Sequence, residues 1–186
     1  MILPMANSEP LTTASLGSFP SAPGRKDQRE LSWLAVECAG CGLLLPLADA
    51  GEISPFTGCI DVPHTLSWYL GVANLRGQLH GVVDLPCFLG LVQPTNAPPP
   101  AGGWMVALNA RLEVNCALRV DQLAGLRKED ELVQVDADAN AHDGGGRPRF
   151  AGLRYREAAG SARVWQEIKL AELASDAHFL DILARP

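Results

Sequence analysis

Residues 71–90 have the sequence GVANLRGQLHGVVDLPCFLG, and they carry more structural information than any other stretch of the chain. The segment 78–83 is rich in apolar and β-branched residues, which predicts a β-strand. Asp84 follows at the N-cap position of a short predicted helix, with Pro86 in its first turn and Gly90 just past its end. The stretch therefore predicts a strand that runs directly into a helical turn.

Short apolar runs separated by turn residues recur along the rest of the chain. The runs 31–38 and 42–47 predict a hairpin that turns at Ala39-Gly40, and their nearly continuous apolar character predicts strands buried on both faces. Further elements are expected as a helical turn at 48–52, a loop at 53–70, strands at 104–108 and 132–135, a hairpin of 150–157 and 162–168, a short helix at 170–174 and a final element at 179–183.

A clear alternation occupies residues 112–121. Apolar side chains occupy every second position, and mostly polar ones lie between them: Leu112, Val114, Cys116, Leu118 and Val120 against Glu113, Asn115, Ala117, Arg119 and Asp121. A period of two predicts a strand with one buried face and one largely polar face.

These patterns predict an all-β fold with short helices, either a barrel or a sandwich, because no long amphipathic helix interrupts the strands. The chain has 186 residues, of which 47% are hydrophobic and 19% charged, a globular composition. A domain of this length buries roughly 70% of its unfolded surface, so it needs neither a disulfide nor a metal to fold. We expect a flexible tail at 1–29, rich in Pro and Ser, and one folded domain at 30–183.

The formal net charge is −6, which argues against a nucleic acid as the main partner. No run approaches the roughly 20 apolar residues of a membrane span, and the N-terminus lacks the pattern of a secretory signal. Five cysteines at irregular spacing favour reduced thiols and a cytoplasmic location.

The chemical motifs are weak. Cys38 and Cys41 form a CxxC across a predicted turn, which permits structural thiols, a redox or metal site, or a thiol-dependent enzyme; zinc would need two more ligands. The four histidines are scattered, and the glycine run lacks the Lys-Ser/Thr of a phosphate-binding loop. These residues are His64, His80, His142 and His178, and Gly144, Gly145 and Gly146.

Arg76 and the tryptophans leave two interpretations open. Arg76 is either a solvated turn residue or a fork of donors that clamps carboxylates or carbonyls, within the domain or on a partner. Trp68 is an interface anchor if exposed and a core residue if buried, while Trp104 is expected in the core.

The stretch from Gly71 to Leu85, closing in Phe88-Leu89-Gly90, resembles the signature of CheW-like domains. That signature is approximately G-(V/I)-x-N-(L/V)-R-G, followed by (V/I)-(V/I)-D-L and a final (F/L)-G. The resemblance extends more loosely over 30–183. Segments 63–71 and 164–170 resemble the PilI type, which serves type IV pili, although 165–170 departs from the usual family C-terminus.

The resemblance implies two SH3-like five-stranded barrels that share an apolar core. It implies a non-catalytic chemotaxis-type adaptor without cofactor, active in signal transduction and twitching motility. Its partners would be the cytoplasmic tip of a methyl-accepting chemoreceptor and the regulatory domain of a CheA-type histidine kinase.

On this resemblance, Arg76 organises the receptor side, while Asn74, Gly71, Val72 and Gly77 shape its loop for the close approach of a partner. Trp68 completes the partner-binding set. An RNA-binding β-barrel remains an alternative, because five arginines gather near the second hairpin: Arg147, Arg149, Arg154, Arg156 and Arg163.

Overall fold

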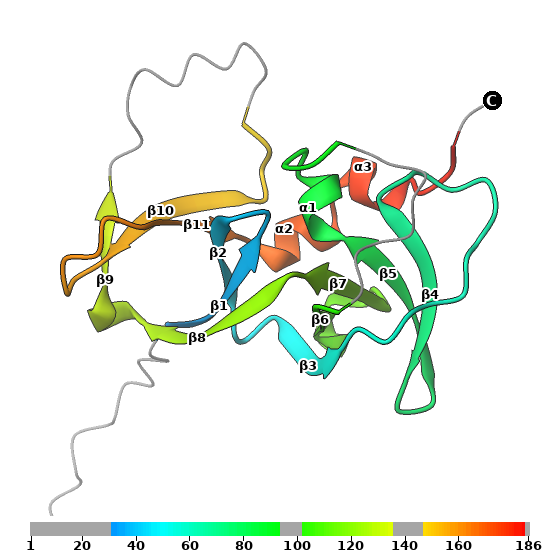
Figure 1. Ribbon diagram of the computed structural model, residues 1–186, viewed down its shortest axis with the longest axis horizontal. Helices are drawn as coiled ribbons and strands as arrows, with labels where there is room; N and C mark the ends of the chain where they lie inside the picture. Colours follow the sequence, from blue (N-terminus) through cyan, green and yellow to red (C-terminus); the bar gives the residue numbers. More distant parts are fainter. Residues whose placement is uncertain (1–30, 94–101, 136–146, 185–186) are drawn as a thin grey trace, which may run out of the picture.

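The computed structural model describes residues 31–93, 102–135 and 147–184 (Figure 1). The predicted tail at 1–29 and most of the loops at 94–103 and 136–149 lie outside the described residues. Two curved sheets lie side by side, and three short helices sit close to where they meet (Figure 1).

The first sheet has six strands in the order β8-β1-β2-β11-β10-β9. Strands β2 and β11 pair in parallel, and the other neighbours are antiparallel. The sheet curls, because its terminal strands β8 and β9 follow each other in the chain through the 3-10 turn η2. The elements are β1 Ser32–Cys38, β2 Cys41–Pro46, β8 Gln122–Lys128, η2 Glu129–Glu131, β9 Leu132–Val135, β10 Ala151–Glu157 and β11 Val164–Ile168.

The second sheet has five strands in the order β3-β6-β7-β5-β4, with β5 and β7 parallel. Its strands are β3 Ala50–Pro55, β4 Tyr69–Leu75, β5 Gln78–Asp84, β6 Trp104–Leu108 and β7 Cys116–Val120. The helices are α1 Leu85–Phe88, η1 Ala110–Leu112, α2 Leu170–Ala174 and α3 Ala177–Leu180. Among the helices described, none has the length and apolar character needed to cross a membrane.

Apolar side chains form one shared core and a smaller core in each unit. Along β1, Leu34 and Val36 point into the shared core, whereas Trp33 and Ala35 point into the core of the six-stranded unit. The shared core also contains side chains of the five-stranded sheet, α2 and α3. This arrangement confirms the predicted all-β fold of two barrel-like units on a common core, although one unit has six strands where five were expected.

Most predicted elements are present. The hairpin β1–β2 pairs Cys38 with Cys41 across Ala39-Gly40, and both strands are buried on both faces, as predicted. The strand at 104–108, the strand at 132–135, the helix at 170–174 and the hairpin β10–β11 are likewise confirmed.

Five expectations were wrong or incomplete. Residues 50–52 belong to strand β3 rather than to a helical turn, and β4 begins inside the predicted loop at its C-terminal end. The predicted strand at 112–121 is only β7, and β7 is buried throughout because it lies centrally between two neighbours. Strand β8 was not predicted, and the last element is helix α3, which ends at Leu180.

Candidate functional site

Arg76 lies at the tip of the hairpin formed by β4 and β5. Leu75 pairs with Gln78, so the turn itself has two residues, Arg76 and Gly77, whose φ angles are 48° and 87°. Positive φ at both central positions is the property of a type I′ turn, whose twist matches the flanking strands. The Gly77 N–H donates to Oδ1 of Asn74 at 2.7 Å, so Asn74 and Gly77 both determine the shape of this turn.

The Arg76 side chain contacts a carboxylate of its own domain while remaining exposed. Its Nε lies 3.0 Å from Oε1 of Glu52 on β3, and the two side chains are 82% and 26% exposed. An exposed pair of this kind contributes at most about 1 kcal/mol to stability. The contact therefore orients the guanidinium and leaves most of it accessible to a partner.

Gly71 and Val72 have a role inside the domain. Val72 exchanges two backbone hydrogen bonds of 2.8 Å with Ile60, which bridges to β4 from the preceding loop. Gly71 has a φ of 127°, and a Cβ there would lie 2.1 Å from the Ile60 carbonyl oxygen. The close approach that Gly71 permits is thus to the chain itself.

Trp68 is a core residue, which corrects its inclusion among the exposed partner-binding residues. Its side chain is 6% exposed. The indole packs edge-on against Phe88, with ring centroids 5.1 Å apart, and nearly parallel to Phe179 at 6.4 Å. Trp104 is half-buried against the shared core, in agreement with expectation.

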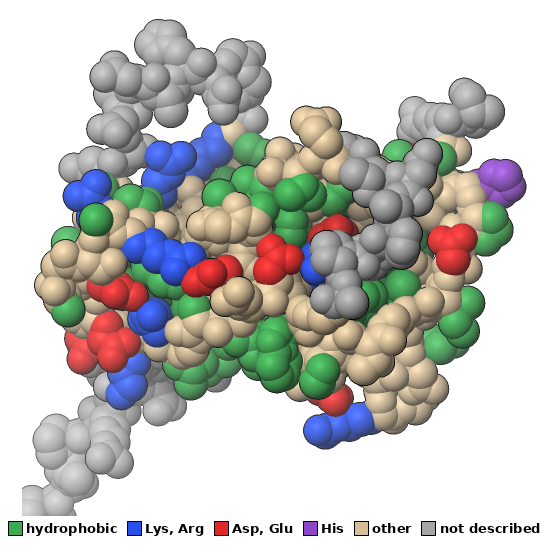
Figure 2. Space-filling view, in the orientation of Figure 1, with side chains coloured by type: hydrophobic (Ala, Val, Ile, Leu, Met, Phe, Trp, Pro, Cys, Tyr) green, Lys and Arg blue, Asp and Glu red, His purple; other side chains and the backbone are tan. Residues whose placement is uncertain are grey.

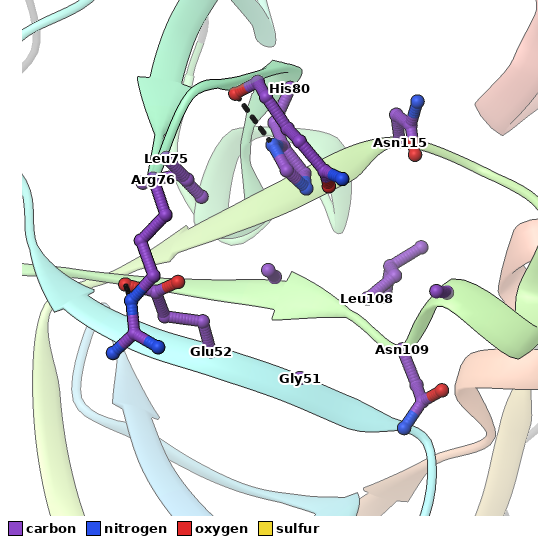
Figure 3. A pocket seen from close by; sticks show the side chains of 11 residues that line it. Gly51, Glu52, Leu75, Arg76, His80, Leu108, Asn109 and Asn115 are labelled. Carbon is purple, nitrogen blue, oxygen red and sulfur yellow. Dashed lines mark hydrogen bonds and ion pairs between the residues drawn. The ribbon is translucent and has the colours of Figure 1, made fainter.

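A pocket of about 450 Å³ opens beside the β4–β5 turn (Figure 3). Arg76 and Glu52 lie at one end, Asn109 and Asn115 lie apart from them, and His80 extends from β5 into the space. The lining comes from four separate segments of the chain, so no spacing in the sequence predicts it. The full lining is Gly51, Glu52, Leu75, Arg76, Gln78, His80, Ala107, Leu108, Asn109, Ala110 and Asn115.

The CxxC does not form a reactive dithiol. All five cysteines are free thiols; Cys41 is exposed and Cys38 is buried. Burial, reinforced by the nearby Asp121 carboxylate, raises the pKa of the Cys38 thiol to about 12, so it carries no thiolate at neutral pH. Across the described ranges, no group of three His, Cys, Asp or Glu side chains is placed to hold a metal ion.

Of the remaining histidines, His64 lies in the loop before β4, and His178 packs against the aromatic ring of Trp68. His142 and the glycine run 144–146 lie outside the described residues. None of the histidines in the part described is hydrogen-bonded to a cysteine or serine side chain.

The arginines near the second hairpin are partly neutralised. Arg163 pairs with Glu37 at 2.6 Å and lies over the Trp165 ring, and Arg149 lies 3.6 Å from Glu172. Lys and Arg side chains gather over the six-stranded unit on the face in Figure 2, next to acidic ones. Trp165 is buried, like Trp33, so the tryptophans of this unit cannot stack on bases as an RNA-binding barrel requires.

Arg119 forms a buried ionic cluster that the sequence pattern did not predict. Its side chain is 4% exposed, and its Nη1 lies 3.3 Å from Asp84 and 3.0 Å from Asp121. Asp121 also accepts the Ala39 N–H at 2.7 Å, so the cluster connects the β1–β2 turn to the five-stranded sheet. Asp84 occupies the expected N-cap position of α1, although its side chain makes no capping hydrogen bond.

Burial of this cluster has an electrostatic consequence at Asp84. Removal from water raises the pKa of the Asp84 carboxyl above its ordinary value, and the neighbouring Arg119 guanidinium opposes that rise. Nε of Arg119 is buried without a hydrogen-bond partner among the described atoms. The cluster is therefore held by charge rather than by complete hydrogen bonding.

Comparison with known proteins gives a consistent result. The family model of the CheW-like domain matches residues 32–175 of this chain. "Protein PilI" of Pseudomonas aeruginosa is 30% identical over 110 residues, which are 57% of this chain and 60% of that protein, so the match spans less than two thirds of PilI. The crystal structure of scaffolding protein TtCheW from Thermoanaerobacter tengcongensis has a similar fold, with a TM-score of 0.61 at 16% identity, covering 83% of this chain and 98% of that one.

Proposed function

Because this chain belongs to the CheW-like domain family, we propose that it couples a methyl-accepting chemoreceptor to a CheA-type histidine kinase in the control of type IV pili. An adaptor role in chemosensory signalling is the property that the family and the likeness to PilI both support. The receptor, the kinase and the pilus output are the finer parts of the proposal. Coupling means that receptor conformation biases the kinase equilibrium through a shared complex.

The observation that carries the proposal is the presentation of Arg76. The type I′ turn fixes its backbone at a hairpin tip, and Glu52 engages only its Nε. The exposed end of the guanidinium retains donors that suit a carboxylate or carbonyl of a receptor helix. A preorganised donor loses less conformational entropy on binding than a free side chain does.

A surface separate from Arg76 must contact the kinase if receptor and kinase bind at the same time. A barrel edge suits this role, because edge strands leave backbone groups available for pairing with another domain. The adaptor role is non-enzymatic, and the raised pKa of Cys38 supports that assignment against a thiol-dependent enzyme.

The test compares Arg76→Ala with wild type in capture of receptor and kinase from native lysate, followed by affinity measurement with the purified partners. We expect a loss of about 2 kcal/mol or more in receptor binding, about 30-fold in Kd, as for an interface hot spot. Thermal unfolding should change little, because the Arg76–Glu52 pair is exposed.

Two variants serve as controls. Arg156→Ala removes another exposed arginine, from the other unit, and should bind normally. Glu52→Ala keeps Arg76 but removes the carboxylate that its Nε contacts, and should cost less affinity than Arg76→Ala. Receptor and kinase affinities that do not change in Arg76→Ala would refute the proposal.

A further inference from the structure

The pocket beside the β4–β5 turn has a chemical character of its own. We propose that it binds a neutral primary amide, carried by a Gln or Asn side chain of the docked receptor helix. The identity of the amide follows from the pocket lining alone. Its assignment to a receptor helix rests on the proposed function.

His80 is the most buried polar residue of the pocket lining. The residue is 9% exposed, and its Nδ1 lies 3.2 Å from the backbone carbonyl oxygen of Gln78. A carbonyl can only accept, so Nδ1 carries the proton in this contact and, in the neutral ring, Nε2 is left as an acceptor. The ring extends into the pocket (Figure 3), which places an acceptor where a ligand N–H can reach it.

Two side-chain amides of the same lining supply donors. Oδ1 of Asn109 accepts the Arg111 N–H at 3.1 Å, so the NH₂ group of Asn109 is the part free to donate. Asn115 uses its backbone carbonyl to accept the Gly81 N–H, and its side-chain amide has no partner in the described part of the chain. The pocket thus offers both donors and an acceptor, which a primary amide matches with its own carbonyl and NH₂ group.

Charge excludes the ionic alternatives. The two charged residues of the lining, Arg76 and Glu52, pair with each other at one end of the pocket, apart from Asn109 and Asn115 (Figure 3). A carboxylate or an ammonium group deeper in the pocket would lose its hydration without an unpaired counter-charge. A neutral polar group escapes that cost.

The floor and the size also suit a side chain on an apolar stem. Leu75, Ala107 and Leu108 provide apolar surface for methylene groups. The volume of about 450 Å³ lies within the 300–1,000 Å³ of typical ligand pockets, which is large enough for side chains from adjacent turns of a helix.

The first experiment titrates three small probes into the full-length ¹⁵N-labelled chain and follows backbone, side-chain amide and imidazole resonances by NMR. The probes are the Nα-acetyl methylamides of glutamine, glutamate and norleucine, which share one backbone and differ in side chain. We expect saturable shifts at His80, Asn109 and Asn115 with the glutamine probe. Binding of the other two should be at least fivefold weaker.

Two variants test whether these residues carry the effect. His80→Leu keeps the side-chain bulk but removes the acceptor, and should abolish the preference for glutamine; His64→Asn, at an exposed histidine, should not. Should His80→Leu fail to fold, Asn115→Ala at an exposed position replaces it. The proposal is overturned by equal responses to the three probes, by the absence of saturable shifts at the pocket, or by a response that survives in the pocket variant.

A second arm identifies the source of the amide. Receptor capture that falls at least fivefold in His80→Leu assigns the amide to the receptor helix, whereas unchanged capture with intact probe binding in wild type overturns that assignment. Receptor capture by Arg76→Ala tests the adaptor role independently of the pocket. Failure of the probe titration, with receptor capture still dependent on Arg76, removes the pocket proposal and leaves the adaptor role in place.

Discussion

Replacing Arg119 with alanine should destabilise the protein strongly at neutral pH and less in acid. At 3.3 Å and an effective dielectric constant of about 20, the attraction between Arg119 and Asp84 is about 5 kcal/mol before the cost of desolvation. Removing one partner of a buried pair leaves the other charge uncompensated, which costs about 3–5 kcal/mol. Asp121 contributes less, because its side chain is 35% exposed.

The pH dependence of this loss follows from Asp84. The pKa of Asp84 is already raised in the folded wild-type protein. The contribution of Asp84 to the free energy of unfolding therefore decreases as the pH rises from its pKa in the unfolded chain through its pKa in the folded protein. Without Arg119, the folded-state pKa of Asp84 rises further. In the folded variant, Asp84 therefore stays protonated over a wider pH range than in the wild type. The loss of stability relative to wild type is smallest in acid and largest at neutral and alkaline pH.

Urea unfolding at pH 7.5 and pH 5.0 measures both quantities. We expect a loss of about 3–5 kcal/mol at pH 7.5 and a smaller loss at pH 5.0. The double variant Arg119→Leu with Asp84→Leu should recover most of the stability, because a buried pair and its apolar replacement are often equivalent. A loss below about 1 kcal/mol, or an equal loss at both pH values, would refute the assignment of Arg119 as a buried electrostatic clamp.

Three further predictions concern residues around the hairpin and the core. Gly71→Ala should lower the free energy of unfolding in urea by more than about 2 kcal/mol, because the backbone at Gly71 has a positive φ and a Cβ there would collide with the Ile60 carbonyl oxygen. Gly77→Ala should lower it by about 1 kcal/mol, because open space surrounds Gly77. Trp68→Ala should lower stability by about 3–5 kcal/mol, and a loss under 1 kcal/mol would contradict its place in the core. Iodoacetamide should modify Cys41 rapidly and leave Cys38 unmodified in the native protein, and mass spectrometry can follow both reactions. Equal rates of modification at the two cysteines would contradict the burial of Cys38.

Pairing between strands that are adjacent in the chain was predictable from the sequence, because residues close in the chain determine it. The hairpin β1–β2 follows from two apolar runs and the Ala39-Gly40 turn, and α2 lies where the short helix was predicted, at Leu170–Ala174. The candidate partner site was predictable only in part. The motif around Arg76 identified the turn, but Glu52, which orients Arg76, lies on a strand that was predicted as a helical turn.

The remaining features depend on contacts between segments that are far apart in the chain, which local sequence patterns do not record. Arg119 occupies an outward position in the alternation of 112–121, yet it is buried because β5 and β6 flank its strand and Asp84 neutralises it. Trp68 precedes β4 in an irregular loop, and its burial results from helix α3, which comes more than a hundred residues later. Neither contact leaves a periodic signal near the residue itself.

The parallel pairing of β2 with β11 determines the order in which the chain can assemble during synthesis. All strands of the five-stranded sheet lie between Ala50 and Val120, so they have emerged before the second half of the other sheet is translated. The hairpin β1–β2 emerges first but must wait for Val164–Ile168, which completes its sheet from the far end of the chain. Until then its apolar edge is open to aggregation, as unpaired edges generally are during biogenesis. A ribosome that stalls before residue 164 would therefore release a chain that has every strand of the five-stranded sheet but lacks β11, α2 and α3.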